Sequence, residues 1–158
     1  FVSSSFSKSF SLYGERVGAL SIVTASKEEA ARVLSQVKRV IRTNYSNPPT
    51  HGASVVGSVL NSPELRALWE AELTEMRERI RSMRLAMVQG LADLGAKRDF
   101  SFVARQRGMF SYSGLTAEQV ERLRSEFGIY AVGTGRICVA ALNRNNLDPV
   151  LNAINAVL

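Results

Sequence analysis

Cysteine and histidine are nearly absent from this 158-residue chain, which has one of each, Cys138 and His51. A single cysteine excludes a disulfide framework within the chain, and its apolar, strand-like surroundings favour a reduced core thiol. One cysteine and one histidine far apart in the sequence make a poor ligand set for a metal. We therefore expect no metal site, and we interpret His51, which follows two prolines, as a structural residue.

Long apolar runs are missing as well. No stretch reaches the roughly 20 residues that a membrane-spanning helix needs, and no signal-peptide pattern opens the chain. With 46% hydrophobic and 22% charged residues, the composition is that of a globular protein. Together with the reduced cysteine, these observations predict a cytoplasmic protein that has no membrane partner.

Acidic residues are outnumbered, 14 against 20 lysines and arginines, which gives a net charge of +6. A basic balance is typical of nucleic-acid-binding proteins, but the basic residues here are scattered among acidic ones. The densest cluster contains Arg77, Arg79, Arg81 and Arg84, interleaved with Glu75 and Glu78. This alternation is typical of the solvated face of a helix, so we expect no nucleic-acid partner.

A lysine near the start of the chain is the strongest candidate for chemistry. Lys8 lies among small serine side chains, and Arg16 follows eight positions later. A lysine that does covalent chemistry must be approachable and must lose its proton, because only the neutral amine is nucleophilic. A nearby guanidinium disfavours a second positive charge, and its fork of donors also suits a phosphate. The pattern therefore indicates an amine that can react with a cofactor.

Two other interpretations of this stretch exist. A lysine among serines is often only a solvated loop residue. Residues 5–8 also fit the Ser-x-x-Lys box of serine acyl-enzymes. That box is accompanied by later Ser-Asp-Asn and Lys-Thr-Gly boxes, and the chain has neither, which argues against an acyl-enzyme.

Hydrophobic periodicity and capping residues predict alternating strands and helices. Strands are expected at residues 1–7, 19–24, 109–112, 129–132 and 136–142, the second of them buried. Helices are expected at 26–45, 51–60, 63–94, 116–127 and 147–158, with capping boxes at Ser26 and Thr116. Residues 100–103 fit either a short helix or a strand. The pattern predicts an α/β fold organised along one long helix.

The stretch from Ser5 to Gly18 closely resembles the cofactor-lysine motif of the class I (fold type I) aminotransferases, which use pyridoxal phosphate. Every fixed position of that motif is met. Three later blocks, residues 42–53, 108–115 and 135–140, extend the resemblance along almost the whole chain. It is closest to the aspartate and aromatic amino-acid aminotransferases.

This resemblance implies the α/β fold of the C-terminal part of a fold type I transferase. Residues 1–75 would be the incomplete end of the large cofactor-binding domain, with part of its sheet and helices. Residues 76–158 would be a small α+β domain, joined to the first by the long helix at about 63–94. The family lysine lies past the middle of its chain, so we expect the C-terminal portion of a longer enzyme.

The resemblance also implies a reaction, the transfer of an amino group between aspartate or an aromatic amino acid and a 2-oxo acid. Lys8 would bind the aldehyde of pyridoxal phosphate covalently and shuttle the substrate proton. Ser5 and Arg16 would hold the cofactor phosphate. The alternatives are an ordinary serine at a strand end and a surface ion pair between Arg16 and Glu15.

Substrate-binding residues follow from the same resemblance. Arg136 matches the arginine that binds the substrate α-carboxylate; its alternative is an internal salt bridge. Arg42 matches an arginine that reaches across a homodimer to a distal carboxylate; its alternative is an arginine at a helix C-terminus. Phe110 matches an aromatic residue that lines the pocket, and its alternative is core packing.

The chain lacks several cofactor-binding residues that the family has. In the family, the aspartate that protonates the cofactor ring, the stacked aromatic ring and the phosphate loop all precede the lysine. We therefore expect little or no transaminase activity from these residues alone, and exposed apolar edges within residues 1–60. Two non-enzymatic alternatives are a dimerising module with a relic lysine motif and a helix-pairing protein built on residues 63–94.

Overall fold

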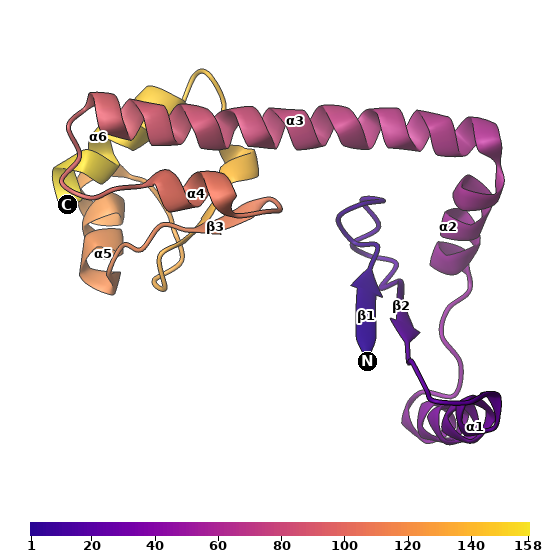
Figure 1. The fold of residues 1–158 in the computed structure, drawn as a ribbon. Helices are drawn as coiled ribbons and strands as arrows, with labels where there is room; N and C mark the ends of the chain where they lie inside the picture. Colours follow the sequence, from indigo (N-terminus) through magenta and orange to yellow (C-terminus); the bar gives the residue numbers. More distant parts are fainter. The chain divides into compact units, whose positions relative to one another are not determined.

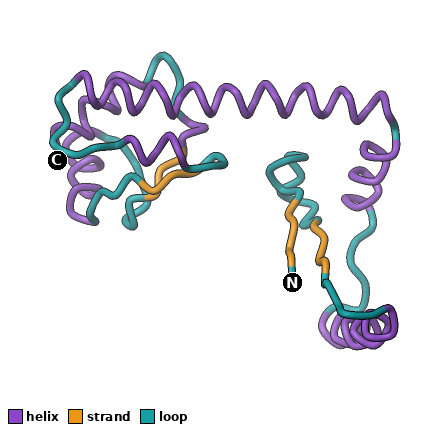
Figure 2. The backbone as a smooth tube through the Cα atoms, viewed as in Figure 1, coloured by secondary structure: helices purple, strands orange, loops and turns teal.

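The computed structural model describes residues 1–158, which divide into two compact units, Phe1–Leu73 and Thr74–Leu158. Most of the ordered structure is helical, and the strands form only two short pairs (Figure 1, Figure 2). The predicted α/β class is confirmed in a helix-rich form. The longest element is α3 (Pro63–Asp93), as predicted, and its residues contribute to both units. No helix has the combined length and apolar character of a bilayer-spanning segment.

The first unit opens with a β-hairpin. Strand β1 (Val2–Ser5) pairs antiparallel with β2 (Gly18–Ser21), with Ser5 opposite Gly18. A Cβ atom on Gly18 would lie 2.6 Å from the carbonyl oxygen of Ser4, so the close approach requires glycine. The prediction of a buried strand at 19–24 is wrong, because every residue of this isolated two-stranded ribbon is exposed.

Helix α1 (Lys27–Asn44) begins where its capping residue predicts. The Ser26 hydroxyl accepts a hydrogen bond from the Glu29 amide at 3.1 Å. The Glu29 carboxylate accepts from the Ala25 amide at 2.8 Å, one residue before the position expected for a capping box. None of the residues of α1 is buried, although its apolar side chains share one face. The expectation that residues 1–60 expose apolar surface is therefore confirmed.

Helix α2 (His51–Asn61) follows two prolines and buries only Gly52 and Val56. It lies against the hairpin loop, where a Cβ atom on Gly52 would come within 2.8 Å of the Glu15 Cβ. The start of α3 also contacts that loop. Trp69 donates from Nε1 to the Ser9 carbonyl at 2.8 Å, and its ring stacks on Phe10 with centroids 4.6 Å apart. These contacts hold the loop that carries Lys8.

The second unit contains the hydrophobic core. Its elements after α3 are α4 (Ser101–Arg105), β3 (Phe110–Tyr112), α5 (Ala117–Phe127), β4 (Arg136–Cys138), the 3-10 helix η1 (Val139–Ala141) and α6 (Leu147–Val157). Strands β3 and β4 pair antiparallel, with Tyr112 opposite Arg136. The core side chains come from α3, α5, α6 and the segments between them, and include Met87, Leu91, Val103, Leu123, Val139 and Ile154.

Two strand predictions in this unit are wrong. Residues 129–132 form no strand, because no neighbouring strand pairs with them. The strand expected over 136–142 ends at Cys138 and continues as η1. Residues 101–105 are helical, which settles the choice left open at 100–103 in favour of the helix.

The arginine cluster on α3 also differs from expectation. Arg77 and Arg81 are solvent-exposed and pair with Glu78, at 3.7 and 3.3 Å. Arg84, however, is 4% exposed, and Arg79 donates to two backbone carbonyls of the same unit. The prediction of a solvated arginine face therefore holds for Arg77 and Arg81 and is wrong for Arg84, which is buried; Arg79 is exposed to solvent but also binds two carbonyls.

Candidate functional site

The β1–β2 hairpin carries three of the predicted site residues: Ser5 ends β1, and Lys8 and Arg16 lie in the loop that connects the strands. Pairing of Ser5 with Gly18, extended by a hydrogen bond from the Phe6 amide to the Val17 carbonyl at 3.2 Å, closes this loop at its base. Local bonds inside the loop, including Ser11 amide to Lys8 carbonyl at 3.3 Å, fold the lysine region into a tight turn. Three residues that the sequence separates by up to eleven positions thus belong to one structural element.

Lys8 is exposed, and its ammonium nitrogen lies 3.7 Å from the centre of the Tyr13 ring. At this distance the negative face of the ring attracts the ammonium group. The interaction limits the directions in which the side chain points. Sequence reasoning did not single out Tyr13, although its position in the same loop was visible.

Arg16 adopts a left-handed backbone conformation, with φ of 51°. This conformation is costly for a residue with a side chain, and it is accompanied by a hydrogen bond from Arg16 Nη1 to the Tyr13 carbonyl at 3.1 Å. The alternative of an ion pair with Glu15 is not what the structure shows. The Glu15 carboxylate lies 2.9 Å from His51 Nδ1, at the start of α2.

The Ser5 side chain lies at the base of the same loop. Its Oγ accepts a hydrogen bond from the Ser7 amide at 3.3 Å, and its hydroxyl hydrogen can be donated elsewhere. A hydroxyl, an amine and a guanidinium on one loop form a donor set for an anion such as a phosphate. The one carboxylate of the loop, that of Glu15, contacts His51. The residues present therefore fit a phosphate-bearing group with an aldehyde that an amine can attack.

Arg42 lies elsewhere in the first unit, in the last turn of α1. Its Nη1 donates to the Ser46 hydroxyl at 2.5 Å, and the side chain is exposed. A cation in this position interacts favourably with the C-terminal end of the helix. The geometry is compatible with a helix-terminal arginine and with one that binds a carboxylate from another molecule.

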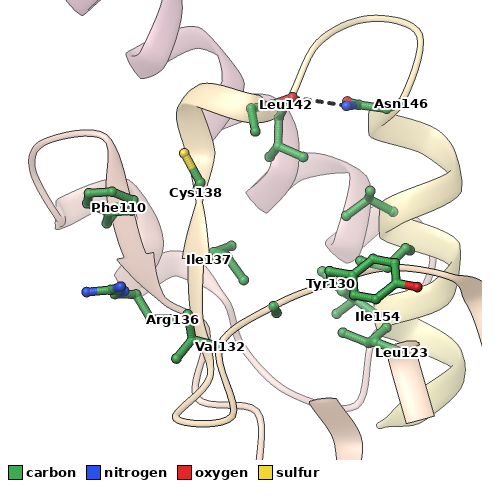
Figure 3. A pocket seen from close by; sticks show the side chains of 14 residues that line it. Phe110, Leu123, Tyr130, Val132, Arg136, Ile137, Cys138, Leu142, Asn146 and Ile154 are labelled. Carbon is green, nitrogen blue, oxygen red and sulfur yellow. Dashed lines mark hydrogen bonds between the residues drawn. The ribbon is translucent and has the colours of Figure 1, made fainter. Parts of the chain in front are cut away.

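Arg136 and Phe110 lie together in the second unit, on neighbouring strands. The guanidinium carbon of Arg136 lies 5.0 Å from the centre of the Phe110 ring (Figure 3). No acidic residue of the chain forms a salt bridge with Arg136, which is exposed at the start of β4. Phe110 is 39% exposed, so it is not a core residue. Both structural alternatives for this pair are therefore disfavoured.

An open pocket of about 510 Å³ adjoins these two residues. The rest of its wall is mostly apolar, with Asn146 as a polar member, and includes Leu123, Tyr130, Val132, Ile137, Leu142 and Ile154 (Figure 3). Cys138 is a free, half-buried thiol in the same wall rather than a fully buried core residue. A guanidinium beside apolar surface can bind a carboxylate whose remaining part is uncharged.

The sequence placed Arg79 and Arg84 on a solvated helix face and did not reveal that both bind backbone carbonyls of the second unit. Arg84 follows Ile80 by four positions and precedes Met87 by three, so it belongs to the apolar stripe of α3. An arginine within an apolar stripe is a signal of a buried, hydrogen-bonded guanidinium. This pattern is visible in the sequence, but the glutamates that alternate with the arginines favour the interpretation of a solvated helix face.

Comparisons with known proteins place these residues in context. Residues 1–154 match the family "Aminotransferase class I and II". The chain is 83% identical over 158 residues to an aspartate aminotransferase of Pseudomonas aeruginosa, covering 100% of this chain and 40% of the relative. It is 54% identical over 157 residues to an aromatic-amino-acid aminotransferase of Escherichia coli, covering 99% of this chain and 40% of that protein.

A solved structure gives the same result. An aromatic-amino-acid aminotransferase of Burkholderia pseudomallei, covalently bound to pyridoxal phosphate, superimposes with a TM-score of 0.93 at 75% sequence identity. The similarity covers 99% of this chain and 39% of the Burkholderia chain. The chain thus spans about 40% of the length of the curated relatives that it matches.

Proposed function

The chain belongs to the class I and II aminotransferases, and from that membership we propose that it supplies the lysine and carboxylate-binding residues of a pyridoxal-phosphate-dependent transaminase. The observation that carries this proposal is the hairpin loop, which holds Ser5, Lys8 and Arg16 on one element. The covalently bound pyridoxal phosphate of the Burkholderia relative supports the same assignment.

In this proposal, Ser5 and Arg16 hold the cofactor phosphate, and the Lys8 amine is the attachment point for the aldehyde. When bound, pyridoxal phosphate supplies an electron sink for charge that develops on the substrate α-carbon. Lys8 holds and returns the α-proton at its Nζ atom. Tyr13, whose ring centre lies 3.7 Å from that nitrogen, restricts the position of the Lys8 side chain.

The proposed substrates are an amino acid and a 2-oxo acid, with Arg136 binding the α-carboxylate. Phe110 restricts the orientation of the Arg136 guanidinium through its ring, 5.0 Å away. Curated relatives act on aspartate and on aromatic amino acids, so both classes are candidate substrates. For a dicarboxylic substrate, we propose that Arg42 reaches across a homodimer. There it binds the distal carboxylate of the substrate in the neighbouring active site.

The proposal extends to domain organisation and location. Residues 1–75 would belong to the large cofactor-binding domain and residues 76–158 to the small domain, joined by the helix at about 63–94. The protein would act in the cytoplasm.

The test uses a chimera, the Pseudomonas relative in which the matching 40% is replaced by this chain. Borohydride reduction in the presence of pyridoxal phosphate should label the peptide that contains Lys8, as detected by mass spectrometry. Lys8→Ala should abolish both the label and the near-visible absorbance of the bound cofactor. It should also lower the transamination rate by about 10³-fold or more, because the proton carrier is lost.

Lys38→Ala is the matched control, since Lys38 is an exposed lysine of α1; it should keep label and activity. Label that persists in Lys8→Ala would refute the assignment of Lys8. A chimera that binds no cofactor would favour the alternative of a non-catalytic module with a relic lysine motif. The isolated chain should show little turnover of aspartate and 2-oxoglutarate, and turnover at enzymic rates would contradict that expectation.

A further inference from the structure

The buried guanidinium of Arg84 makes four hydrogen bonds inside the second unit. Nη2 donates to the carbonyls of Gly108 and Phe110, at 2.6 and 2.9 Å. Nη1 donates to the Val103 carbonyl at 3.2 Å and to the Ser111 hydroxyl. Arg84 is 4% exposed, and no acidic side chain forms a salt bridge with it.

A buried cation that has only neutral acceptors is unusual. Desolvation costs free energy that a carboxylate partner would normally offset in part. Burial lowers the pKa of Arg84 from its ordinary value, and the nearby charge of Arg107 adds a smaller effect in the same direction. The fork geometry of the guanidinium lets one side chain bind acceptors that different backbone segments supply.

Two of those acceptors, the Phe110 carbonyl and the Ser111 hydroxyl, belong to β3, the strand that carries Phe110, and Gly108 lies two residues before Phe110. Strand alternation directs Ser111 inward, where it is 2% exposed, and directs Phe110 and Tyr112 to the opposite side. The Phe110 ring faces the Arg136 guanidinium, and Tyr112 is paired with Arg136 in the sheet. By binding the backbone of β3, Arg84 fixes the position of the surface against which Arg136 lies.

Arg79 binds the segment that follows the second strand, β4. Its Nη2 donates to the Ala140 carbonyl at 2.6 Å, and its Nη1 donates to the Leu142 carbonyl at 3.0 Å. Ala140 is part of η1, which follows β4 without a break. Arg84 therefore binds β3 itself, whereas Arg79 binds the segment that directly follows β4.

We infer that Arg84 and Arg79 are positioning residues for carboxylate binding by Arg136: Arg84 holds the strand that carries Phe110 against α3, and Arg79 holds the segment directly after the strand that carries Arg136. This inference rests on the proposed function, in which Arg136 binds the substrate carboxylate. Neither residue contacts the substrate; each acts through the backbone that orients the Phe110–Arg136 pair. Their neighbours Arg77 and Arg81, which pair with Glu78 in solvent, have no such role.

The chimera described above provides the experiment, with Arg84→Gln and Arg79→Gln as test variants. Arg81→Gln and Arg77→Gln are matched controls from the same helix. Steady-state kinetics should show KM for the 2-oxo acid rising about ten- to a hundredfold in Arg84→Gln, because small displacements of binding groups have effects of this size. The value of kcat should change much less, and the control variants should match the parent in both parameters.

A second readout is independent of activity. In the isolated chain, the Arg136 Nε–H signal in ¹⁵N NMR spectra should shift in Arg84→Gln and stay unchanged in Arg81→Gln. Should Arg84→Gln fail to fold, Ser111→Ala removes one acceptor while leaving the core side chains intact. Ser111→Ala should raise KM for the 2-oxo acid and shift the Arg136 signal in the directions expected for Arg84→Gln, but by a smaller amount.

The outcomes separate the two hypotheses. A lowered melting temperature with unchanged KM and an unchanged Arg136 signal would show that Arg84 is only structural, and the inference would be wrong. An Arg84→Lys variant with the KM and the Arg136 signal of the parent would also overturn the inference. Lysine keeps the positive charge but lacks the forked donors of the guanidinium. If Arg136→Lys itself leaves KM unchanged, the proposed carboxylate-binding role fails, whatever Arg84→Gln does.

Discussion

Gly135, directly before Arg136, shows how one residue controls the geometry of the second unit. Its φ is +80°, and a Cβ atom would lie 2.6 Å from the Leu115 carbonyl oxygen. Its own carbonyl accepts from the Ser113 amide at 2.9 Å and from the Ser113 hydroxyl at 2.7 Å. Only glycine combines this backbone conformation with such close approach, so the direction in which β4 begins depends on this position.

We therefore expect Gly135→Ala to lower the free energy of unfolding of the second unit by about 2 kcal/mol, through backbone strain and steric overlap. Urea denaturation followed by NMR methyl signals of Met87 and Leu91 measures this. Gly133→Ala is the control, because a Cβ atom there meets nothing within 4 Å. Equal stability of the two variants would contradict the argument.

Helix α5 illustrates how an element is fixed at both ends. The Thr116 hydroxyl accepts from the Gln119 amide at 3.2 Å, and the Gln119 side-chain oxygen accepts from the Thr116 amide at 3.0 Å. Gly128 ends the helix in a left-handed conformation. Gln119 Nε2 also donates to the Val157 carbonyl at 3.0 Å, which links the start of α5 to the end of α6.

Thr116→Ala should cost about 1 kcal/mol of unfolding free energy, the usual loss for a helix N-cap. Ser125→Ala on the same helix should stay within about 0.5 kcal/mol of the parent, because the exposed Ser125 hydroxyl bonds only to the Glu121 carbonyl. Denaturant unfolding monitored by methyl signals of the second unit provides both values. A larger loss in Ser125→Ala than in Thr116→Ala would exclude the cap as the source of stability.

At the scale of the whole molecule, the two units differ in how much apolar surface they bury. The core cluster lies entirely in the second unit, whereas Val56 is the one buried large apolar residue of the first. Leu20, Val23, Leu34 and Val40 are all more than half exposed. Because buried apolar area provides most of the stability of a folded unit, the first unit of the isolated chain should be the weaker one.

The single tryptophan reports on this difference. Trp69 contacts Ser9 and Phe10 of the first unit, so its fluorescence should change at a lower urea concentration than the Met87 methyl signal. Phe10→Leu, which removes the stacked ring, should shift the tryptophan transition and leave the methyl transition in place. Coincident transitions for both probes would show instead that the chain unfolds as one cooperative unit.

Local signals in the sequence predicted the helices well and the strands poorly. The starts of α1 and α5 were predicted from Ser26 and Thr116, because a capping hydroxyl and the backbone amide that donates to it lie within four residues. The strand expected at 129–132 was wrong, since an apolar run forms a strand only where a partner pairs with it. The assigned site roles of Ser5, Lys8, Arg16, Arg42, Phe110 and Arg136 remain predictions.

The sequence alone determined the family and the lysine loop, because the residues of that motif follow one another within a single hairpin. It also determined where helices begin and end. The tertiary structure decided which arginines face solvent, which bind backbone carbonyls and which lies beside an aromatic ring. The acceptors of Arg84 come from residues 19 to 27 positions later and those of Arg79 from more than 60 positions later. A guanidinium finds acceptors so distant in the chain only once the unit has folded around them.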